Sequence, residues 1–143
     1  MKKLFVICLA VSAIFSCKRA ETGFSQEERR LINSADSIMR VLTIEDSLDL
    51  AVLRAVSRDF SADALMSEDF ARLSELMVAT VTHPSQDGVG IAGPQVGLNR
   101  RVVAVQRFDK EGEPFEVYPN IRIVCLSDSV AYGPEGCLSV PDM

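Results

Sequence analysis

Two short segments of this 143-residue sequence carry groups that could do chemistry. Residues 88–97 read GVGIAGPQVG, and their glycines permit unusual backbone angles and close approach of a ligand to the chain. The amide of Gln95 can both donate and accept hydrogen bonds, which suits a carbonyl oxygen or a metal-bound water better than a phosphate. The segment lacks the Lys-Ser/Thr end of a phosphate-binding loop, and no strand leads into it as a dinucleotide fingerprint requires. Taken alone, it could also be an ordinary tight connection.

The second segment, residues 135–139, reads EGCLS. A cysteine thiolate is a good ligand for a divalent transition metal, and Gly136 leaves the backbone beside Cys137 open. Two plainer interpretations remain: Cys137 is a buried structural residue, or it forms a disulfide with Cys125 in an oxidising compartment. None of the four cysteines forms a CxxC pair, which excludes a zinc ribbon and a thioredoxin motif.

The amino terminus has the pattern of an export signal. Three residues, MKK, precede the apolar run LFVICLAVSAIF at 4–15, which is shorter than the roughly 20 residues of a membrane span. The following SC completes IFSC, which resembles a bacterial lipobox. We therefore expect a signal peptide over residues 1–16, with Cys17 as the lipidated first residue of an exported, membrane-anchored lipoprotein on the periplasmic or cell-surface face. A plain signal peptide or an uncleaved anchor is the alternative.

The two segments must be positioned by the secondary-structure elements around them. Along the chain, the sequence predicts helices first and strands later. Apolar residues three and four apart predict a helix from Glu27 to Leu42, a less regular helical stretch covers 46–57, and the clearest helix covers 67–81 with Ser67 as its N-cap. Alternating or β-branched stretches predict strands at 101–108, 115–118 and 121–126. This order indicates an α+β domain. The net charge of -5 argues against a nucleic-acid partner.

In this order, GVGIAGPQVG and EGCLSVP resemble the first and second motifs of the peptide deformylase family. Weaker similarity in DLAVLRAVSRDF and YPNIRIV extends the resemblance over about residues 44–143. Gly93 departs from it, because the family usually has a second Ala there. The resemblance implies a peptide-deformylase-like α+β fold, with residues 17–43 as tether and N-terminal helix, followed by a partial deformylase domain.

The resemblance also implies an activity, namely hydrolysis of the formyl group from N-formylmethionyl peptides with release of formate. By carry-over, Cys137 would be a ligand of the metal, ferrous iron with zinc or nickel as alternatives. As catalytic groups, Gln95 would bond the metal-bound water or the formyl oxygen, and the backbone N–H of Leu138 would help to hold the developing oxyanion. The substrate groove would be lined by Gly88, Val89, Gly90, Ile91 and Gly136. Glu135 would anchor the loop.

The family's third motif, a helix carrying HExxH, has no counterpart in a sequence whose one histidine is His83. Two metal ligands and the general acid/base are therefore missing, and we expect a truncated chain, without its C-terminal metal-binding helix, that is inactive as given and does not retain the metal alone. The rival hypothesis is an exported lipoprotein that binds peptides without catalysis. A redox protein using Cys125 and Cys137 is a third. The expected partner is an N-formylmethionyl peptide, such as a released formyl-peptide or signal fragment, and the membrane is contacted only through the signal or lipid anchor.

Overall fold

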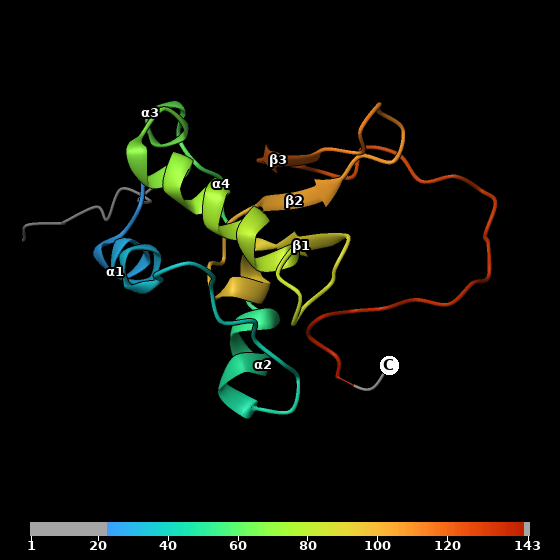
Figure 1. Ribbon diagram of the computed structural model, residues 1–143, viewed down its shortest axis with the longest axis horizontal. Helices are drawn as coiled ribbons and strands as arrows, with labels where there is room; N and C mark the ends of the chain where they lie inside the picture. Colours follow the sequence, from blue (N-terminus) through green and yellow to red (C-terminus); the bar gives the residue numbers. More distant parts are fainter. Residues whose placement is uncertain (1–22, 142–143) are drawn as a thin grey trace, which may run out of the picture.

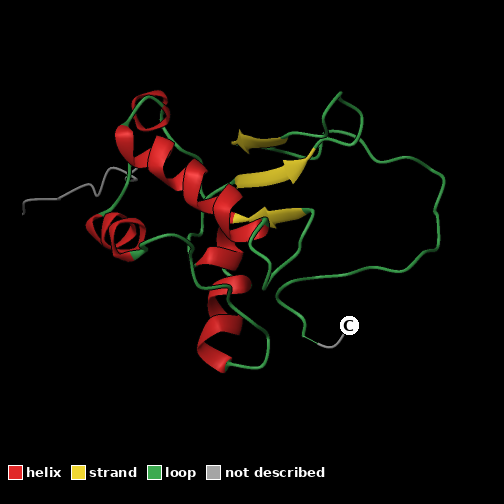
Figure 2. Ribbon diagram, viewed as in Figure 1, coloured by secondary structure: helices red, strands yellow, loops and turns green. Residues whose placement is uncertain are grey.

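The computed structural model describes residues 23–141, so the expected signal peptide and Cys17 lie outside the described residues. Four helices come first, and they are α1 (Gln26–Ser34), α2 (Ser47–Leu53), α3 (Ala62–Leu65) and α4 (Glu68–Val81). A short sheet follows, made of β1 (Gly90–Ala92), β2 (Val102–Gln106) and β3 (Phe115–Pro119). The α+β class predicted from the sequence is confirmed (Figures 1 and 2). Across residues 23–141, no helix is both long and apolar enough to span a membrane.

The sheet has the order β1-β2-β3, and both pairings are antiparallel. Helix α4 lies across the sheet and packs on all three strands (Figure 1). Between these layers is a core of fully buried apolar side chains, which includes Leu73, Leu76 and Met77 from α4 and Val102 and Ala104 from β2. Alternate residues of β2 face this core, as the period of a half-buried strand requires.

Helix α4 begins where the sequence predicts. The Ser67 hydroxyl accepts a hydrogen bond from the backbone N–H of Phe70, and Glu68 and Asp69 occupy the first turn, where the helix dipole favours negative charge. The helix ends at Val81, just before His83-Pro84. This helix therefore delivers the chain to the first glycine, Gly88, whose N–H donates to the carbonyl of Val81 at 3.0 Å.

The N-terminal helix is shorter than predicted, because α1 ends at Ser34 rather than at Leu42. The backbone of the residues beyond it donates hydrogen bonds to other parts of the fold. The N–H of Met39 donates to Thr80 Oγ1 at 2.8 Å, and the N–H of Leu42 donates to the Gln95 carbonyl at 2.8 Å. Met39 and Leu42 are nevertheless buried, as their place in the apolar pattern indicated.

The strand predicted at 121–126 is wrong, since β3 is the last strand within the described residues. Asn120 stops the sheet. Its φ of 54° is in the left-handed region, and its side-chain amide holds both the N–H and the carbonyl of Phe60, at 2.8 and 3.0 Å. The chain leaves β3 there and runs in an extended path around to residue 137, with exposed Ile123, Val124 and Leu126 (Figure 1).

Candidate functional site

A cavity of about 460 Å³ opens where the glycine-rich segment meets the returning C-terminal loop. Both segments singled out in the sequence contribute to it, although they are far apart along the chain. Its wall is formed by Asp87, Gly88, Val89, Gly90, Gln95, Gly136, Cys137 and Leu138. The fold therefore brings the two candidate segments into one site.

Gln95 is held in a fixed orientation at the centre of this site. It lies in a 3₁₀ turn, Gly93–Val96, directly after β1, and its Oε1 accepts the backbone N–H of Ala92 at 2.9 Å. That bond leaves the amide Nε2 to face the second segment. Nε2 lies 3.2 Å from Ser139 Oγ and 4.0 Å from Cys137 Sγ. The side chain thus presents N–H donors beside the thiol.

One segment without helix or strand structure, residues 39–44, is hydrogen-bonded to both halves of the site. Leu42 N–H donates to the Gln95 carbonyl at 2.8 Å, and Ile44 N–H donates to the Ser139 carbonyl at 2.9 Å. Between them, Thr43 N–H donates to Asp49 Oδ2, and Arg40 donates to both oxygens of that carboxylate. These hydrogen bonds, that from Arg40 above all, hold the pKa of Asp49 below its ordinary value.

The predicted substrate-binding residues are placed in two ways. Gly88, Val89, Gly90 and Gly136 line the cavity, whereas the Ile91 side chain is 3% exposed and packs in the core. β1 alternates its faces, and the Ile91 side chain is on the buried face, whereas the adjacent Gly90, which has no side chain, contributes to the cavity wall. From the sequence, Gly90 and its neighbours are expected to line the groove through main-chain contacts, and for Ile91 this stays a prediction, because the burial of its side chain does not test it.

Leu138 and Ser139 complete the C-terminal side of the site. The Leu138 side chain packs on the core, and a Cβ added to Gly88 would lie 3.0 Å from its Cδ1, so Gly88 allows the two segments to touch. Among the hydrogen bonds of residues 23–141, none uses the backbone N–H of Leu138. Ser139 is 4% exposed; it belongs to the EGCLS segment, but no role was predicted for its side chain from the sequence.

The donor groups of the described residues do not make a complete metal site. Cys137 supplies one exposed thiol, and within residues 23–141 no three His, Cys, Asp or Glu side chains cluster in a way that could hold a metal ion. His83 is exposed in the turn after α4, with Nδ1 2.8 Å from Ser85 Oγ, and it does not line the cavity. Cys125 and Cys137 are both free thiols.

Comparisons with known proteins agree on one family. A family model described as polypeptide deformylase matches residues 38–143. The peptide deformylase of Leptospira biflexa is 35% identical over 99 residues, covering 64% of this chain and 54% of that protein. That of Caulobacter sp. strain K31 is 36% identical over 111 residues, covering 75% of this chain and 60% of that protein. The chain thus spans little more than half the length of these curated relatives.

A solved structure shows the same likeness in three dimensions. The Met-Ala-Ser-bound class I type b peptide deformylase of Acinetobacter baumannii superposes with a TM-score of 0.61 at 31% sequence identity. The match covers 74% of this chain and 67% of that one. The fold described above is therefore shared over most of the described residues.

Proposed function

Because this chain belongs to the polypeptide deformylase family, we propose that its cavity binds the N-formylmethionyl end of a peptide as part of a deformylase. The observation that carries the proposal is the convergence of Gln95 and Cys137, 42 residues apart in sequence, on one cavity with their Nε2 and Sγ atoms 4.0 Å apart. The reaction would be hydrolysis of the formamide: water adds, the carbon–nitrogen bond breaks, and formate and a free amino terminus leave.

The residues of this chain supply binding and orientation. The amide of Gln95 cannot rotate freely, because its oxygen is held by Ala92 N–H, so its Nε2 is a preorganised donor for the formyl oxygen. The backbone N–H of Leu138, beside Cys137, is a second donor. The backbone at Gly136, where an added Cβ would meet open space, would let the peptide main chain approach closely, and the backbone of Gly90 also lines the cavity.

The metal of the family would supply a Lewis acid at this position. Cys137 would be one of its ligands. Within residues 23–141 no group of three His, Cys, Asp or Glu side chains could hold a metal ion, so we expect this part of the chain not to retain the ion by itself. We propose ferrous iron, with zinc or nickel as alternatives, for the assembled site, and we expect this chain alone to release no formate.

Calorimetric titration with formyl-Met-Ala-Ser and with unformylated Met-Ala-Ser tests the binding proposal. We expect the formylated peptide to bind more tightly than the unformylated one. In Gln95→Glu the ratio of the two dissociation constants should fall about tenfold, because the variant keeps the acceptor for Ala92 N–H and loses the N–H donor. Gln26→Glu adds the same charge at an exposed position of α1 that does not line the cavity, and it should leave the preference unchanged. No binding of either peptide would overturn the proposal, and a coupled assay that detects formate would refute the expected inactivity and the non-catalytic rival alike.

We also propose that the protein is an exported lipoprotein, on the strength of the MKK start, the apolar run and IFSC. Cleavage before Cys17 would leave a globular domain tethered by lipid. Metabolic labelling with an alkyne fatty acid should mark the wild-type protein and Cys8→Ser, and should fail with Cys17→Ser. Equal labelling of the two variants would contradict lipidation at Cys17.

A further inference from the structure

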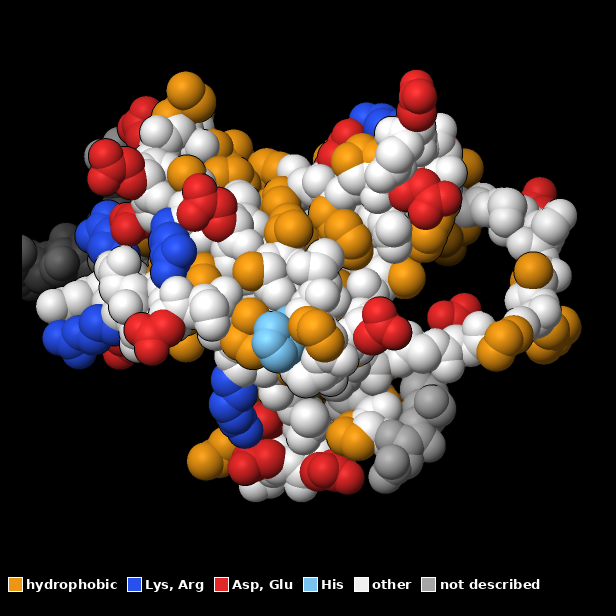
Figure 3. Space-filling model, in the orientation of Figure 1, with side chains coloured by type: hydrophobic (Ala, Val, Ile, Leu, Met, Phe, Trp, Pro, Cys, Tyr) orange, Lys and Arg blue, Asp and Glu red, His pale blue; other side chains and the backbone are white. Residues whose placement is uncertain are grey.

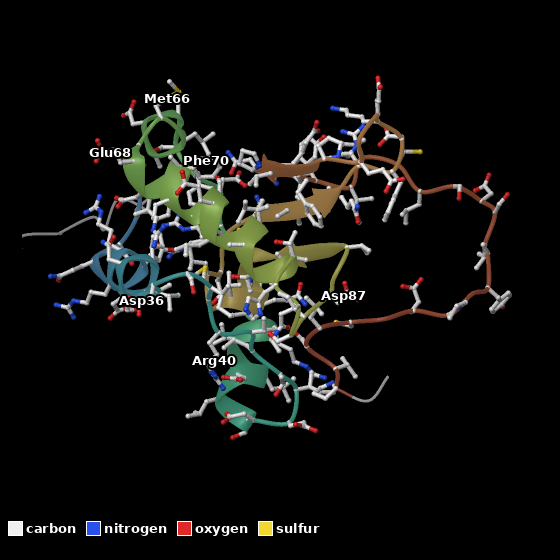
Figure 4. The ribbon with its side chains drawn as sticks, viewed as in Figure 1. Asp36, Arg40, Met66, Glu68, Phe70 and Asp87 are labelled. Atoms are coloured by element: carbon white, nitrogen blue, oxygen red, sulfur yellow. The ribbon has the colours of Figure 1, made fainter. Side chains whose placement is uncertain are left out.

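One acidic side chain, Asp87, lines the candidate site. The other seven residues of the cavity wall include no Asp, Glu, Lys or Arg. Asp87 lies in the loop that leads from α4 into β1, on the opposite side of the molecule from Asp36 (Figure 4). A peptide that enters the cavity therefore meets one fixed negative charge at its rim.

The backbone holds Asp87 at this rim. Its φ of 46° is in the left-handed region, which Asp and Asn adopt more readily than most residues, and its N–H donates to the His83 carbonyl at 3.0 Å. Among the side-chain contacts of residues 23–141, no hydrogen bond or ion pair uses the Asp87 carboxylate, which is exposed. By contrast, Asp49 and Asp59 are paired with arginines. The Asp87 charge is available to a ligand.

Other acidic groups add to the negative electrostatic potential near Asp87. Glu135, which is exposed, directly precedes the cavity residue Gly136, and the whole chain has a net charge of -5. In the space-filling view, the blue Lys and Arg side chains lie mainly over the half of the molecule away from the cavity and near α2, whereas acidic side chains are spread over both halves (Figure 3). An anionic peptide would be repelled here and a cationic one attracted.

We propose that Asp87 is a specificity-determining residue that selects formyl-peptides carrying Lys or Arg directly after the formylmethionine. The inference rests on the proposed function, and it names a substrate class: amino-terminal fragments of secretory signals, whose first segment is positively charged. This chain's own start, MKK, is such a sequence. An exported deformylase would meet these fragments after signal cleavage.

Binding of three amidated peptides to the protein tests the inference, namely formyl-Met-Lys-Lys, formyl-Met-Ala-Ala and formyl-Met-Glu-Glu, measured at about 10 mM and at 0.5 M salt. We expect the Lys peptide to bind about three- to tenfold more tightly than the Ala peptide at low salt, and the difference to shrink at high salt. Asp87→Asn keeps a residue that tolerates the left-handed backbone and should bring the ratio close to one. Asp36→Asn, the matched control, should leave it unchanged.

The outcomes separate this inference from the function on which it rests. If the Ala peptide binds but the Lys and Ala peptides bind equally, or if the ratio survives in Asp87→Asn, the role of Asp87 is overturned while the proposed function stands. If none of the three formyl-peptides binds, the proposed function itself fails, and the inference with it.

Discussion

The fully buried Arg100 offers the most quantitative test of the fold that carries the site. Its side chain is 0% exposed, and it forms a bidentate ion pair with Glu28 of α1, with Nε–Oε1 and Nη2–Oε2 distances of 2.6 and 2.7 Å. Glu28 Oε2 also accepts Ser25 N–H at 2.7 Å, which closes the capping box of α1. One carboxylate therefore neutralises a buried guanidinium and caps the helix that covers it.

We predict that Glu28→Gln lowers the free energy of unfolding by about 3 kcal/mol at pH 7, because breaking a buried ion pair by removing one charge costs roughly 3–5 kcal/mol. We take the lower end of this energy range because Arg100 keeps its hydrogen bonds to the carbonyls of Gly23 and Asp59 in the variant. For a chain of this size, the midpoint of thermal unfolding should fall by roughly 10 °C. Glu27→Gln, the exposed neighbour in the same helical turn, should cost less than about 1 kcal/mol.

The effect of Glu28→Gln should depend on pH in a defined direction. Burial works to raise the pKa of Glu28, but hydrogen bonds from Arg100 and from the Ser25 backbone outweigh it, so the pKa is lowered on folding. A lowered pKa contributes stability above the unfolded value of about 4.3, and this contribution is lost as the pH falls through the folded value. The difference between wild type and Glu28→Gln should therefore be largest near pH 7 and shrink below about pH 4.

Urea unfolding followed by circular dichroism at pH 7 and pH 3 measures both quantities. A double variant, Glu28→Leu with Arg100→Met, separates charge pairing from burial, since it removes both charges and should cost less than Glu28→Gln. The reasoning is refuted if Glu28→Gln costs no more than Glu27→Gln, or if its cost at pH 3 equals its cost at pH 7.

Two further predictions concern the site loops. Gly93→Ala should destabilise the fold by about 1–3 kcal/mol in urea unfolding, because its Cβ would lie 2.7 Å from the Arg100 carbonyl oxygen and 2.8 Å from that of Leu98. The Cβ of the control variant Gly136→Ala would meet open space, so this variant should be near neutral. Equal losses of stability in the two variants would contradict this reasoning. Asp49→Asn should speed hydrogen exchange of the Ile44 amide, which donates to the Ser139 carbonyl. The exposed control Glu45→Gln should leave this exchange rate unchanged. An unchanged rate in Asp49→Asn would argue against anchoring of residues 39–44 by the Asp49 carboxylate.

Local signals in the sequence located much of the fold. The N-cap at Ser67, the Pro after α4 and the alternation in β2 are determined by residues next to one another, so periodicity found these elements. The strand predicted at 121–126 failed because alternation reports only that a segment could pair. Whether it pairs depends on Asn120, whose side chain is bound to the distant backbone of Phe60.

Part of the candidate site could also be predicted from the sequence, because some of its residue types indicate chemistry by themselves. Glycines, Gln95 and Cys137 have types and spacing that indicate chemistry, and the family resemblance joined them before any geometry was known. Ser139 and Asp87 carry no such signal. The Gln95–Ser139 bond and the single charge on the cavity wall exist only because residues 42 or more apart meet, which no local pattern encodes.

The helix predicted to reach Leu42 failed at the segment that holds the site together. A helix over residues 35–42 would have used the N–H groups of Met39 and Leu42 within itself, and these N–H groups instead hold Thr80 and Gln95. Ile44 then holds Ser139. The local helix preference of a segment is overridden where hydrogen bonds to distant parts of the fold are stronger. Conflicts between local preference and tertiary structure are expected at functional sites. The failed prediction therefore identifies residues 39–44 as the connection that keeps Gln95 opposite Cys137, and that connection depends on Asp49.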